Sequence, residues 1–221
     1  MRFQMFKIAF WIIGFSIAIH SAASSTSVEY WHANTLSGKL SDHVAVTMQS
    51  EFRFGSGMKN YYYQHTHFEI KYAIHPWLTV APAYRQVHMR SRETTKVGMT
   101  IEHLPQINCT GKAVWKVLEV SDRIRVERIS KENSGDIQWR FRNKMQCRVT
   151  IVTSPFKLRP YLSDELFYLD ECDGWTRNRF YLGVDIDLEK YYAISVYYMI
   201  EDNFNPSNRY HVAGANIQLK F

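Results

Sequence analysis

The chain has 221 residues, of which 46% are hydrophobic and 15% aromatic, with only 10 Gly and 6 Pro and a formal net charge of +6. This composition is too apolar and too aromatic for an intrinsically disordered chain. The 27 Lys and Arg residues are interspersed with 21 Asp and Glu. Without a basic block, a Gly-rich phosphate loop or zinc-finger spacing, this distribution argues against nucleic-acid binding.

The first segment has the layout of a secretory signal peptide. The basic residues Arg2 and Lys7 lie near the start of the chain. An apolar run follows over residues 8–19, and the small residues Ser21 to Ala23 come next. The apolar run is too short for a transmembrane helix, which needs ~20 residues. We therefore predict cleavage after Ala23, which leaves residues 24–221 as the folded domain.

From residue 28 onward, apolar and polar residues alternate with a period of two, as they do in strands with one apolar face. About eleven strands are predicted, over residues 28–36, 42–54, 60–74, 77–90, 98–109, 114–129, 136–151, 157–169, 176–188, 191–201 and 209–221. Short breaks, such as the one at Cys109 to Lys112, alternate with longer polar ones. Since bacterial single-chain barrels have even strand numbers, we predict 10 or 12 strands, favouring 12, with one segment near 24–42 or 98–116 misassigned.

The strand at residues 137–149 (IQWRFRNKMQCRV) has two very different faces. Its odd-numbered residues are apolar except for Asn143, whereas its even-numbered residues are polar and mostly cationic. A soluble lipocalin-like barrel alternates in the same way, with its apolar face inside. Several runs here exceed ten residues, which suits a tilted strand that crosses a bilayer better than a soluble strand of ~5–6 residues.

Aromatic residues near the strand ends also favour a membrane barrel, because rings with a polar group prefer the lipid headgroup level. They include Tyr61 to Tyr63, Trp77, Trp115, Trp175, Tyr191 and Tyr192. The last strand ends with Ile217, Leu219 and Phe221 on one face, which resembles the signal read by the outer-membrane barrel assembly machinery. We therefore predict an antiparallel up-and-down β-barrel in the outer membrane of a Gram-negative bacterium, with membrane lipids and this machinery as partners.

If the apolar face contacts lipid, the charged residues line the lumen. The predicted ladder of inward charges comprises Arg123, Arg125, Glu127, Arg140, Arg142, Lys144, Arg148, Glu165, Arg179 and Asp185. A row of cations repels itself unless carboxylates lie opposite. The expected partners are Glu127 on the preceding strand and Asp164 and Glu165 on the following one, with Glu51, Glu69, Glu102 and Asp185 further round the barrel.

Several short motifs resemble an uncharacterised family of bacterial outer-membrane β-barrels that is known only as a domain of unknown function. They are DRIRVERI, DIQWRFRNKMQCRV, YLSDELFY, NRFYLGV and NRYHVAGANIQLKF, together with the opening Trp31 and LSGKLSDHVAVTMQSEFRF. The positions that match the family pattern are Arg123, Arg125, Glu127, Trp139, Arg140, Arg142, Glu165, Phe167, Arg179, Gly183 and Phe221. The stretch EHLPQIN departs from it. The resemblance implies the fold and the location but no activity.

Three functions remain open. A structural or narrow channel barrel comes first, and the cationic ladder would then favour small anions. The second is a lipid-modifying enzyme of the outer leaflet, for which His65, His67 and Glu69 are weak candidates at the outer rim, joined by His88 or His103 in a base–carboxylate pair or a metal site. The third is a soluble periplasmic lipocalin-like carrier.

The sequence predicts no catalytic residue, metal site or cofactor with any specificity. No serine stands in a nucleophile elbow, and no HExxH motif occurs. The acidic residues Asp170, Glu171, Asp173, Glu201 and Asp202 form two predicted loop tips, which we read as solvated charge, with binding of divalent cations that bridge lipopolysaccharide as the alternative. The three cysteines, at 109, 147 and 172, include no CxxC pair, and we expect free thiols.

Overall fold

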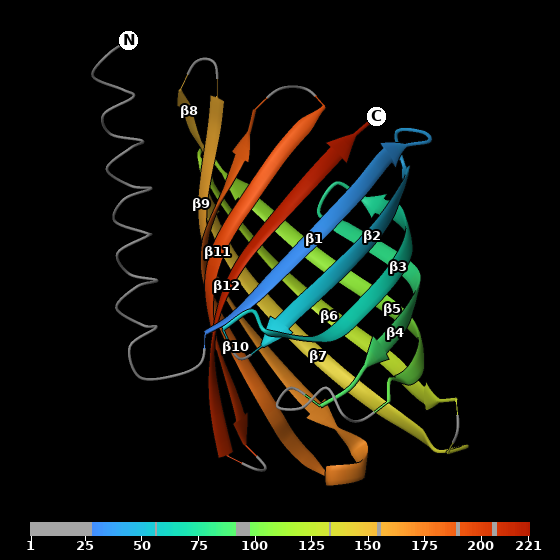
Figure 1. Cartoon of the computed structure of the whole chain (residues 1–221). Coiled ribbons are helices and arrows are strands. Elements are labelled where there is room, and N and C mark those ends of the chain that lie inside the picture. Colours follow the sequence, from blue (N-terminus) through green and yellow to red (C-terminus); the bar gives the residue numbers. More distant parts are fainter. Residues whose placement is uncertain are drawn as a thin grey trace.

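The computed structural model describes residues 28–55, 57–91, 98–132, 134–153, 156–188, 191–204 and 207–221, and these residues form one β-barrel (Figure 1). The predicted signal peptide and its cleavage site lie outside the described residues. The strands are β1 (Val28–Lys39), β2 (Val44–Gly55), β3 (Asn60–His75), β4 (Leu78–Met89), β5 (Thr100–Trp115), β6 (Leu118–Lys131), β7 (Ile137–Val149), β8 (Ile151–Thr153), β9 (Phe156–Leu169), β10 (Gly174–Asp187), β11 (Tyr192–Phe204) and β12 (Ser207–Lys220). A short 3₁₀ helix, η1 (Asp170–Cys172), joins β9 to β10.

The sheet has 12 strands, of which 11 close into the barrel. Strand β8 is an additional short strand that pairs with β9, while β7 pairs with β9 directly. Neighbours in the barrel pair antiparallel, except that β1 and β12 pair parallel, from Val28 beside His211 to Ser37 beside Lys220. The predicted all-β barrel of 10–12 strands is therefore confirmed.

The expectation of an even number of strands is wrong for the closed barrel. Chain direction alternates from strand to strand, so a closed barrel with an odd count must bring its first and last strands together in parallel. The two suspected segments contain the predicted number of strands, because β1 and β5 are each one strand, but the bounds within 98–116 were misassigned. The break predicted at Cys109 to Lys112 is also wrong. Gly111 lies within β5, where it pairs with Leu78 of β4 and with Asp122 of β6. The turn comes at Lys116, whose φ is 53°.

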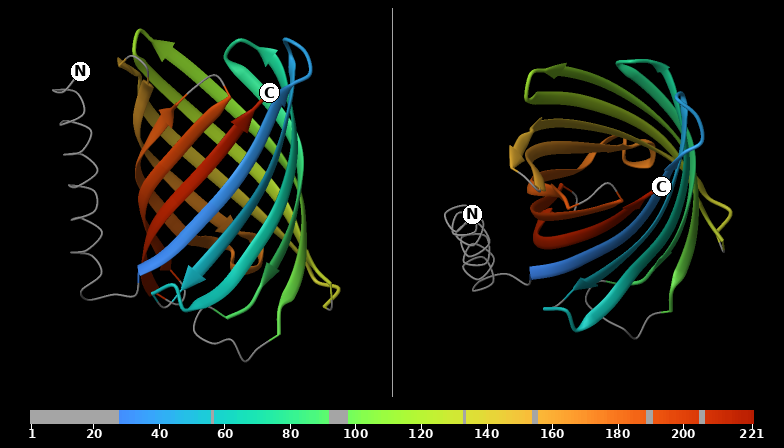
Figure 2. Two further views of the ribbon diagram at one scale, coloured as in Figure 1. Left: turned by 45° about the horizontal axis from the view of Figure 1, so that its top comes forward. Right: turned by 90° about the horizontal axis from the view of Figure 1, so that it is seen from above.

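The barrel has two distinguishable ends. At the end named here the loop end, β2, β4, β6, β9 and β11 end and the strands that follow them begin. At the opposite turn end, β1, β3, β5 and β10 end and the strands that follow them begin, with β8 alongside. Figure 1 shows the loop end at the bottom and the C-terminus at the top, and Figure 2 shows the barrel along its axis.

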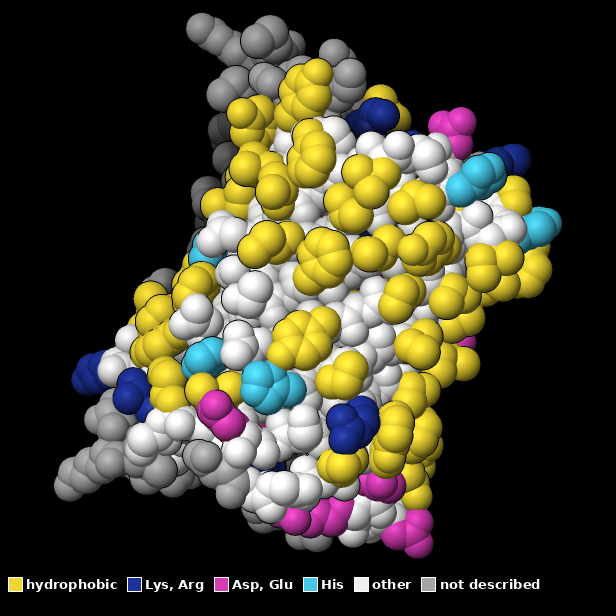
Figure 3. All heavy atoms as spheres, turned by 90° about the vertical axis from the view of Figure 1, so that its right-hand side faces the viewer, with side chains coloured by type: hydrophobic (Ala, Val, Ile, Leu, Met, Phe, Trp, Pro, Cys, Tyr) yellow, Lys and Arg dark blue, Asp and Glu magenta, His cyan; other side chains and the backbone are white. Residues whose placement is uncertain are grey.

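The outer face of the barrel is apolar. Trp139, Phe141 and Met145 are 43%, 42% and 54% exposed there, whereas Arg142, between them in sequence, is 7% exposed. On the side of the barrel shown in Figure 3, hydrophobic side chains dominate the surface between the two ends, and most charged side chains lie near the ends. An apolar exterior on a closed sheet is what a bilayer requires, because every backbone group must be paired inside it. Among the described residues, no helix is long and apolar enough to cross a membrane.

The seam between β1 and β12 is completed by the C-terminal residue. The backbone N–H of Phe221 donates to the carbonyl of Ser37 at 2.9 Å, and that of Lys39 donates to the carbonyl of Phe221 at 3.3 Å. The Phe221 ring covers Gly38, where a Cβ atom would lie 2.2 Å from it. Ile217, Leu219 and Phe221 all lie on the exposed outer face, but their role in assembly stays a prediction.

An aromatic cluster fills part of the lumen. It consists of Trp31, Tyr161, Tyr181, Tyr197, Met199 and Val212. Two of the tyrosines pack onto glycines of the neighbouring strand. A Cβ atom on Gly183 would lie 2.6 Å from the Tyr161 ring, and one on Gly214 would lie 2.0 Å from the Tyr197 ring. These glycines provide the space that lets large rings lie across the lumen.

Gly214→Ala should therefore destabilise the barrel, although Gly→Ala within a strand normally stabilises. The added methyl group overlaps Tyr197, which is 5% exposed and packed against Tyr181, so overpacking should cost about 1–3 kcal/mol. The matched control is Gly111→Ala, because nothing lies within 4 Å of a Cβ atom there. Urea unfolding of the detergent-folded barrel checks this, and equal stability of the two variants would contradict it.

Candidate functional site

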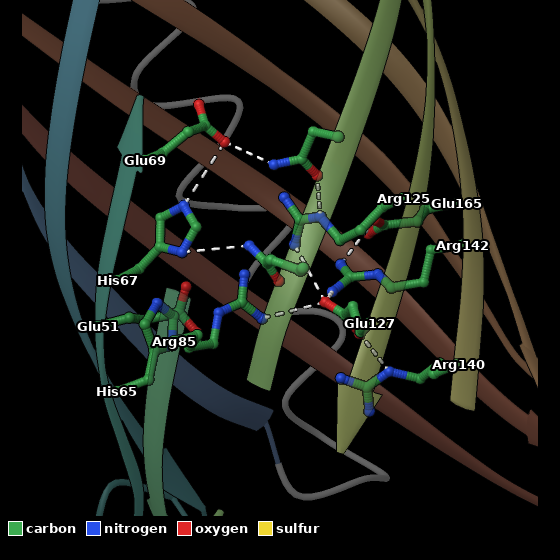
Figure 4. Close-up of polar contacts among 12 residues, drawn as sticks. Glu51, His65, His67, Glu69, Arg85, Arg125, Glu127, Arg140, Arg142 and Glu165 are labelled. Atoms are coloured by element: carbon green, nitrogen blue, oxygen red, sulfur yellow. Dashed lines mark hydrogen bonds and ion pairs between the residues drawn. The ribbon is translucent and has the colours of Figure 1, made fainter. Parts of the chain in front are cut away.

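The centre of the lumen is organised around Glu127 of β6, which is 0% exposed. Its carboxylate lies 2.5 Å from Arg140 Nε, 3.0 Å from Arg142 Nη1, 3.4 Å from Arg125 Nη1 and 3.8 Å from Arg85 Nη1. The four arginines come from β4, β6 and β7, and all project inward because they alternate with outward apolar residues (Figure 4). One buried carboxylate therefore holds four guanidinium groups together.

Glu165 of β9 is a second centre of the same network and is 1% exposed. It accepts hydrogen bonds from Arg142 Nη2 at 2.7 Å, Arg123 Nη2 at 3.0 Å and the Tyr181 hydroxyl at 3.4 Å. Arg142 therefore bridges Glu127 and Glu165. Lys144 Nζ lies 4.2 Å from the centroid of the Tyr181 ring.

Two further carboxylates extend the network round the barrel. Arg179 Nε donates to Glu201 at 2.6 Å, and Arg53 Nε donates to Glu51 at 2.6 Å. The Arg53 guanidinium also lies 3.6 Å from the Trp31 ring centroid. We name this inward set the charge belt, and it comprises Glu51, Arg53, Arg85, Arg123, Arg125, Glu127, Arg140, Arg142, Glu165, Arg179 and Glu201.

Two acidic residues are placed differently from the expectation. Glu201, read as part of a loop tip, is 0% exposed within β11, because that strand runs to Phe204. Asp164 was expected opposite the cations but points outward, whereas its neighbour Glu165 points inward. The Asp164 carboxylate accepts a hydrogen bond from Asn178 at 2.9 Å. Adjacent residues of a strand face opposite sides, so these two carboxylates cannot share the lumen.

The candidates His65, His67 and Glu69 lie inside the lumen and are not at the outer rim. His65 and His67 are 2% and 5% exposed. His67 Nε2 lies 3.6 Å from Glu69, which also accepts a hydrogen bond from Asn108 at 2.6 Å (Figure 4). His103 lies on the opposite, outer face beside the Tyr84 hydroxyl and does not join them. In the described part of the chain, no group of three or more His, Cys, Asp or Glu side chains is arranged to hold a metal ion.

The remaining residues of the predicted ladder lie nearer the turn end. Arg148 contacts Glu119 at 2.9 Å and Asp185 at 3.0 Å. The structure thus places every ladder residue on the inward face, and the two described ion pairs of Arg148 include no residue of the charge belt. The prediction named Glu51 among the carboxylates further round the barrel but omitted Arg53, Arg85, Glu119 and Glu201, although the alternation within their strands would have found them.

A cavity of about 430 Å³, named the chamber here, lies between the charge belt and the loop end. Its loop-end boundary includes Arg90, Lys131, Cys172 and Thr176, next to the connections. Its cationic lining residues are Arg53, Arg85, Arg90, Lys131, Arg140, Arg142, Arg177 and Arg179. Glu102 is the single acidic residue among the described residues that line it. A low-dielectric cavity lined by one sign of charge concentrates ions of the opposite sign.

One wall of the chamber is apolar, which the sequence did not predict. It is the buried cluster Tyr62, Tyr63, Val87, Leu104 and Ile129. Tyr62 and Tyr63 both point inward because β3 has a bulge there. Tyr63 pairs with Arg53 of β2 and Tyr61 pairs with Phe54, so Tyr62 is the extra residue. The Tyr62 hydroxyl donates to Glu29 at 2.6 Å.

The three cysteines are free, as expected. Cys109 is exposed on the outer face, Cys147 is half-buried, and Cys172 is exposed at the chamber.

The closed sheet, the apolar exterior and the charged lumen define an outer-membrane-type β-barrel. Residues 28–212 match the family described as "Protein of unknown function (DUF2490)", and the chain belongs to this family. No curated protein matches the sequence.

Solved structures share the fold at low identity. LpxR from Salmonella typhimurium aligns with a TM-score of 0.51 and 10% identity over 80% of this chain and 83% of that chain. The β domain of the Bordetella autotransporter BrkA aligns with a TM-score of 0.46 and 11% identity over 76% of this chain and 78% of that chain. The KdgM porin aligns with a TM-score of 0.46 and 13% identity over 86% of this chain and 97% of that chain. These likenesses describe the barrel fold alone.

Proposed function

We propose that the protein is an integral barrel of the Gram-negative outer membrane that admits small anions through a constricted lumen, with the chamber as its entrance. The observation that carries this proposal is the chamber lining of eight cationic side chains and one acidic side chain. Rings of Arg and Lys are the usual basis of anion selectivity in pores.

The carboxylates of the charge belt do not cancel this field. Glu127, Glu165 and Glu201 are at most 1% exposed and are already held by arginines. The side chains of Arg140 and Arg177, by contrast, are 22% and 31% exposed. A solute entering from the loop end therefore meets cationic groups first, and the buried anions lie behind them.

The charge belt supplies the constriction. Its ion pairs span β6, β7, β9, β10 and β11 and order long side chains across the lumen. The aromatic cluster adds Tyr181 and Tyr197, whose ring centroids are 5.7 Å apart. Passage past such groups requires an anion to exchange water for arginine donors, so permeation should be slow and limited to small ions.

The alternatives have less support. The apolar exterior opposes a lipocalin-like carrier, which would place its apolar face inside. For an outer-leaflet enzyme, the histidine candidates would need access to lipid, and His65 and His67 are buried in the lumen.

Chloride influx into proteoliposomes that carry an internal chloride-sensitive dye tests the proposal. Wild-type protein should admit chloride faster than protein-free liposomes. The double variant Lys131→Gln/Arg177→Gln should slow the influx several-fold, because it removes chamber charge while keeping the pairs of Glu127. A matched control, Lys39→Gln, neutralises an exposed residue at the turn end, outside the chamber.

Unchanged influx in the double variant, or none in the wild type, would contradict the chamber's role. The location is checked separately: the protein should fractionate with outer membranes and resist carbonate extraction.

A further inference from the structure

The chamber has two unlike walls, and an anion entrance needs only one of them. A water-filled barrel lumen is expected to be polar. Here the lining on β3 to β6 includes Tyr63, Val87, Leu104 and Ile129, which are 8%, 2%, 1% and 4% exposed. Passage of small inorganic anions gives no reason for this apolar wall.

The apolar wall is continuous. Tyr62, Tyr63, Val87, Leu104 and Ile129 form one cluster, against which Met89 and Leu169 pack at its edge. Val87 and Leu104 come from the neighbouring strands β4 and β5, and Ile129 follows on β6. The five cluster residues are at most 8% exposed, so the apolar surface still open to the chamber comes mainly from the partly buried Met89 and Leu169 at the edge. This open part gains free energy when an apolar group covers it, at about 25 cal/mol per Å².

The cationic wall consists of Arg140, Arg142, Arg177 and Arg179 on the adjoining strands β7 and β10. The other four cationic lining residues, Arg53, Arg85, Arg90 and Lys131, lie on or next to β2, β4 and β6. Arg142 and Arg177 flank Phe167 in the sheet register, at 4.4 Å and 5.5 Å from its ring centroid. Arg140 extends this wall toward the loop end through β7. Guanidinium groups in this arrangement suit a carboxylate or phosphate, to which arginine can donate two hydrogen bonds.

We propose that the chamber binds an amphipathic organic anion, in which one or two carboxylate or phosphate groups are attached to an apolar or aromatic body. The anionic group would contact the cationic wall of β7 and β10, and the body would cover the apolar wall of β3 to β6. The volume of about 430 Å³ lies within the ~300–1,000 Å³ of small-molecule sites. This inference rests on the proposed function for the ligand's entry, and it names the class of solute.

Isothermal titration of the wild-type protein in nanodiscs tests the ligand class without any mutation. The probes are acetate, cyclohexanecarboxylate and 2-naphthoate, with empty nanodiscs as the blank for partition into lipid. Affinity should rise along this series as the apolar body grows. Equal affinity for the three probes would overturn the inference.

Variants of the two walls then separate their contributions. Met89→Gln/Leu169→Asn should weaken 2-naphthoate binding by about tenfold, because both side chains line the chamber at the edge of the apolar cluster and the changes keep their shape nearly constant. It should leave the binding of inorganic phosphate unchanged. Arg177→Gln should weaken both probes, by about tenfold for each. Arg148→Gln, on an arginine outside the chamber, is the control with wild-type binding.

The inference and the proposed function can fail separately. If 2-naphthoate binds no better than phosphate while chloride still enters proteoliposomes, the apolar wall is not a ligand surface and the channel proposal stands. If 2-naphthoate binds with the expected dependence on both walls but chloride does not enter, the chamber is a binding site in a closed barrel.

Discussion

Replacing Glu127 with Gln is expected to destabilise the folded barrel by about 3–5 kcal/mol, the largest effect of any single substitution in the charge belt. The carboxylate is 0% exposed and lies within 4 Å of Arg85, Arg125, Arg140 and Arg142. The neutral amide would leave the buried guanidinium groups of Arg85, Arg125 and Arg142, and the partly exposed one of Arg140, without their shared anion. Urea unfolding of the detergent-folded barrel measures this loss.

A double-mutant cycle with Arg140 shows whether the loss comes from charge. Because Arg140→Gln removes one of the uncompensated cations, the double variant Glu127→Gln/Arg140→Gln should be more stable than Glu127→Gln alone. The matched control is Glu119→Gln, whose carboxylate is partly exposed near the turn end and contacts Arg148. A Glu127→Gln loss no larger than that of the control, or no coupling to Arg140, would contradict the role of Glu127 as the centre of the belt.

Replacing Arg142 and Glu165 together with Ser is expected to raise the single-channel conductance several-fold. Arg142 bridges Glu127 and Glu165 at 3.0 Å and 2.7 Å, so its side chain is a central part of the constriction. The double change removes one charge of each sign and leaves the net charge of the belt as it was. A larger conductance therefore reports a wider path and not an altered field.

The matched control is Arg148→Ser/Asp185→Ser, which removes an ion pair of 3.0 Å outside the chamber and the belt. Its conductance should stay close to that of the wild type. An unchanged conductance in Arg142→Ser/Glu165→Ser, with the barrel still folded on a gel, would show that the belt is not the constriction.

Strand alternation was enough to predict which face each charged residue would take. The period of two in residues 137–149 assigned Trp139 and Phe141 to the exterior and Arg140 and Arg142 to the lumen, as observed. The same rule would have placed Asp164 outside, since Glu165 lies inside. That error came from treating neighbouring carboxylates as equivalent.

Which charges meet across the lumen could not be read from the sequence. Arg85 of β4 contacts Glu127 of β6, two strands away, and Arg123 of β6 contacts Glu165 of β9. Such contacts depend on strand register and on the curvature of the closed barrel, which alternation does not specify. The parallel pairing of β1 with β12 also depends on how the barrel closes, which alternation does not specify. The predicted even number of strands was therefore wrong.

The chamber depends on features with little local signal. The bulge at Tyr62 turns two successive tyrosines inward, against the simple alternation of β3. Glu201, at the end of the predicted strand 191–201, was read as part of a loop tip, but β11 continues to Phe204. Such shifts of a few residues at strand ends decide which side chains line the chamber.

The reversal potential of the wild-type protein in a planar bilayer, under a gradient of potassium chloride, tests the central claim most directly. The claim is that a lumen lined by an excess of exposed cationic groups selects anions. A reversal potential close to the chloride equilibrium potential is the result expected from the chamber lining. A reversal potential close to the potassium equilibrium potential would contradict the claim.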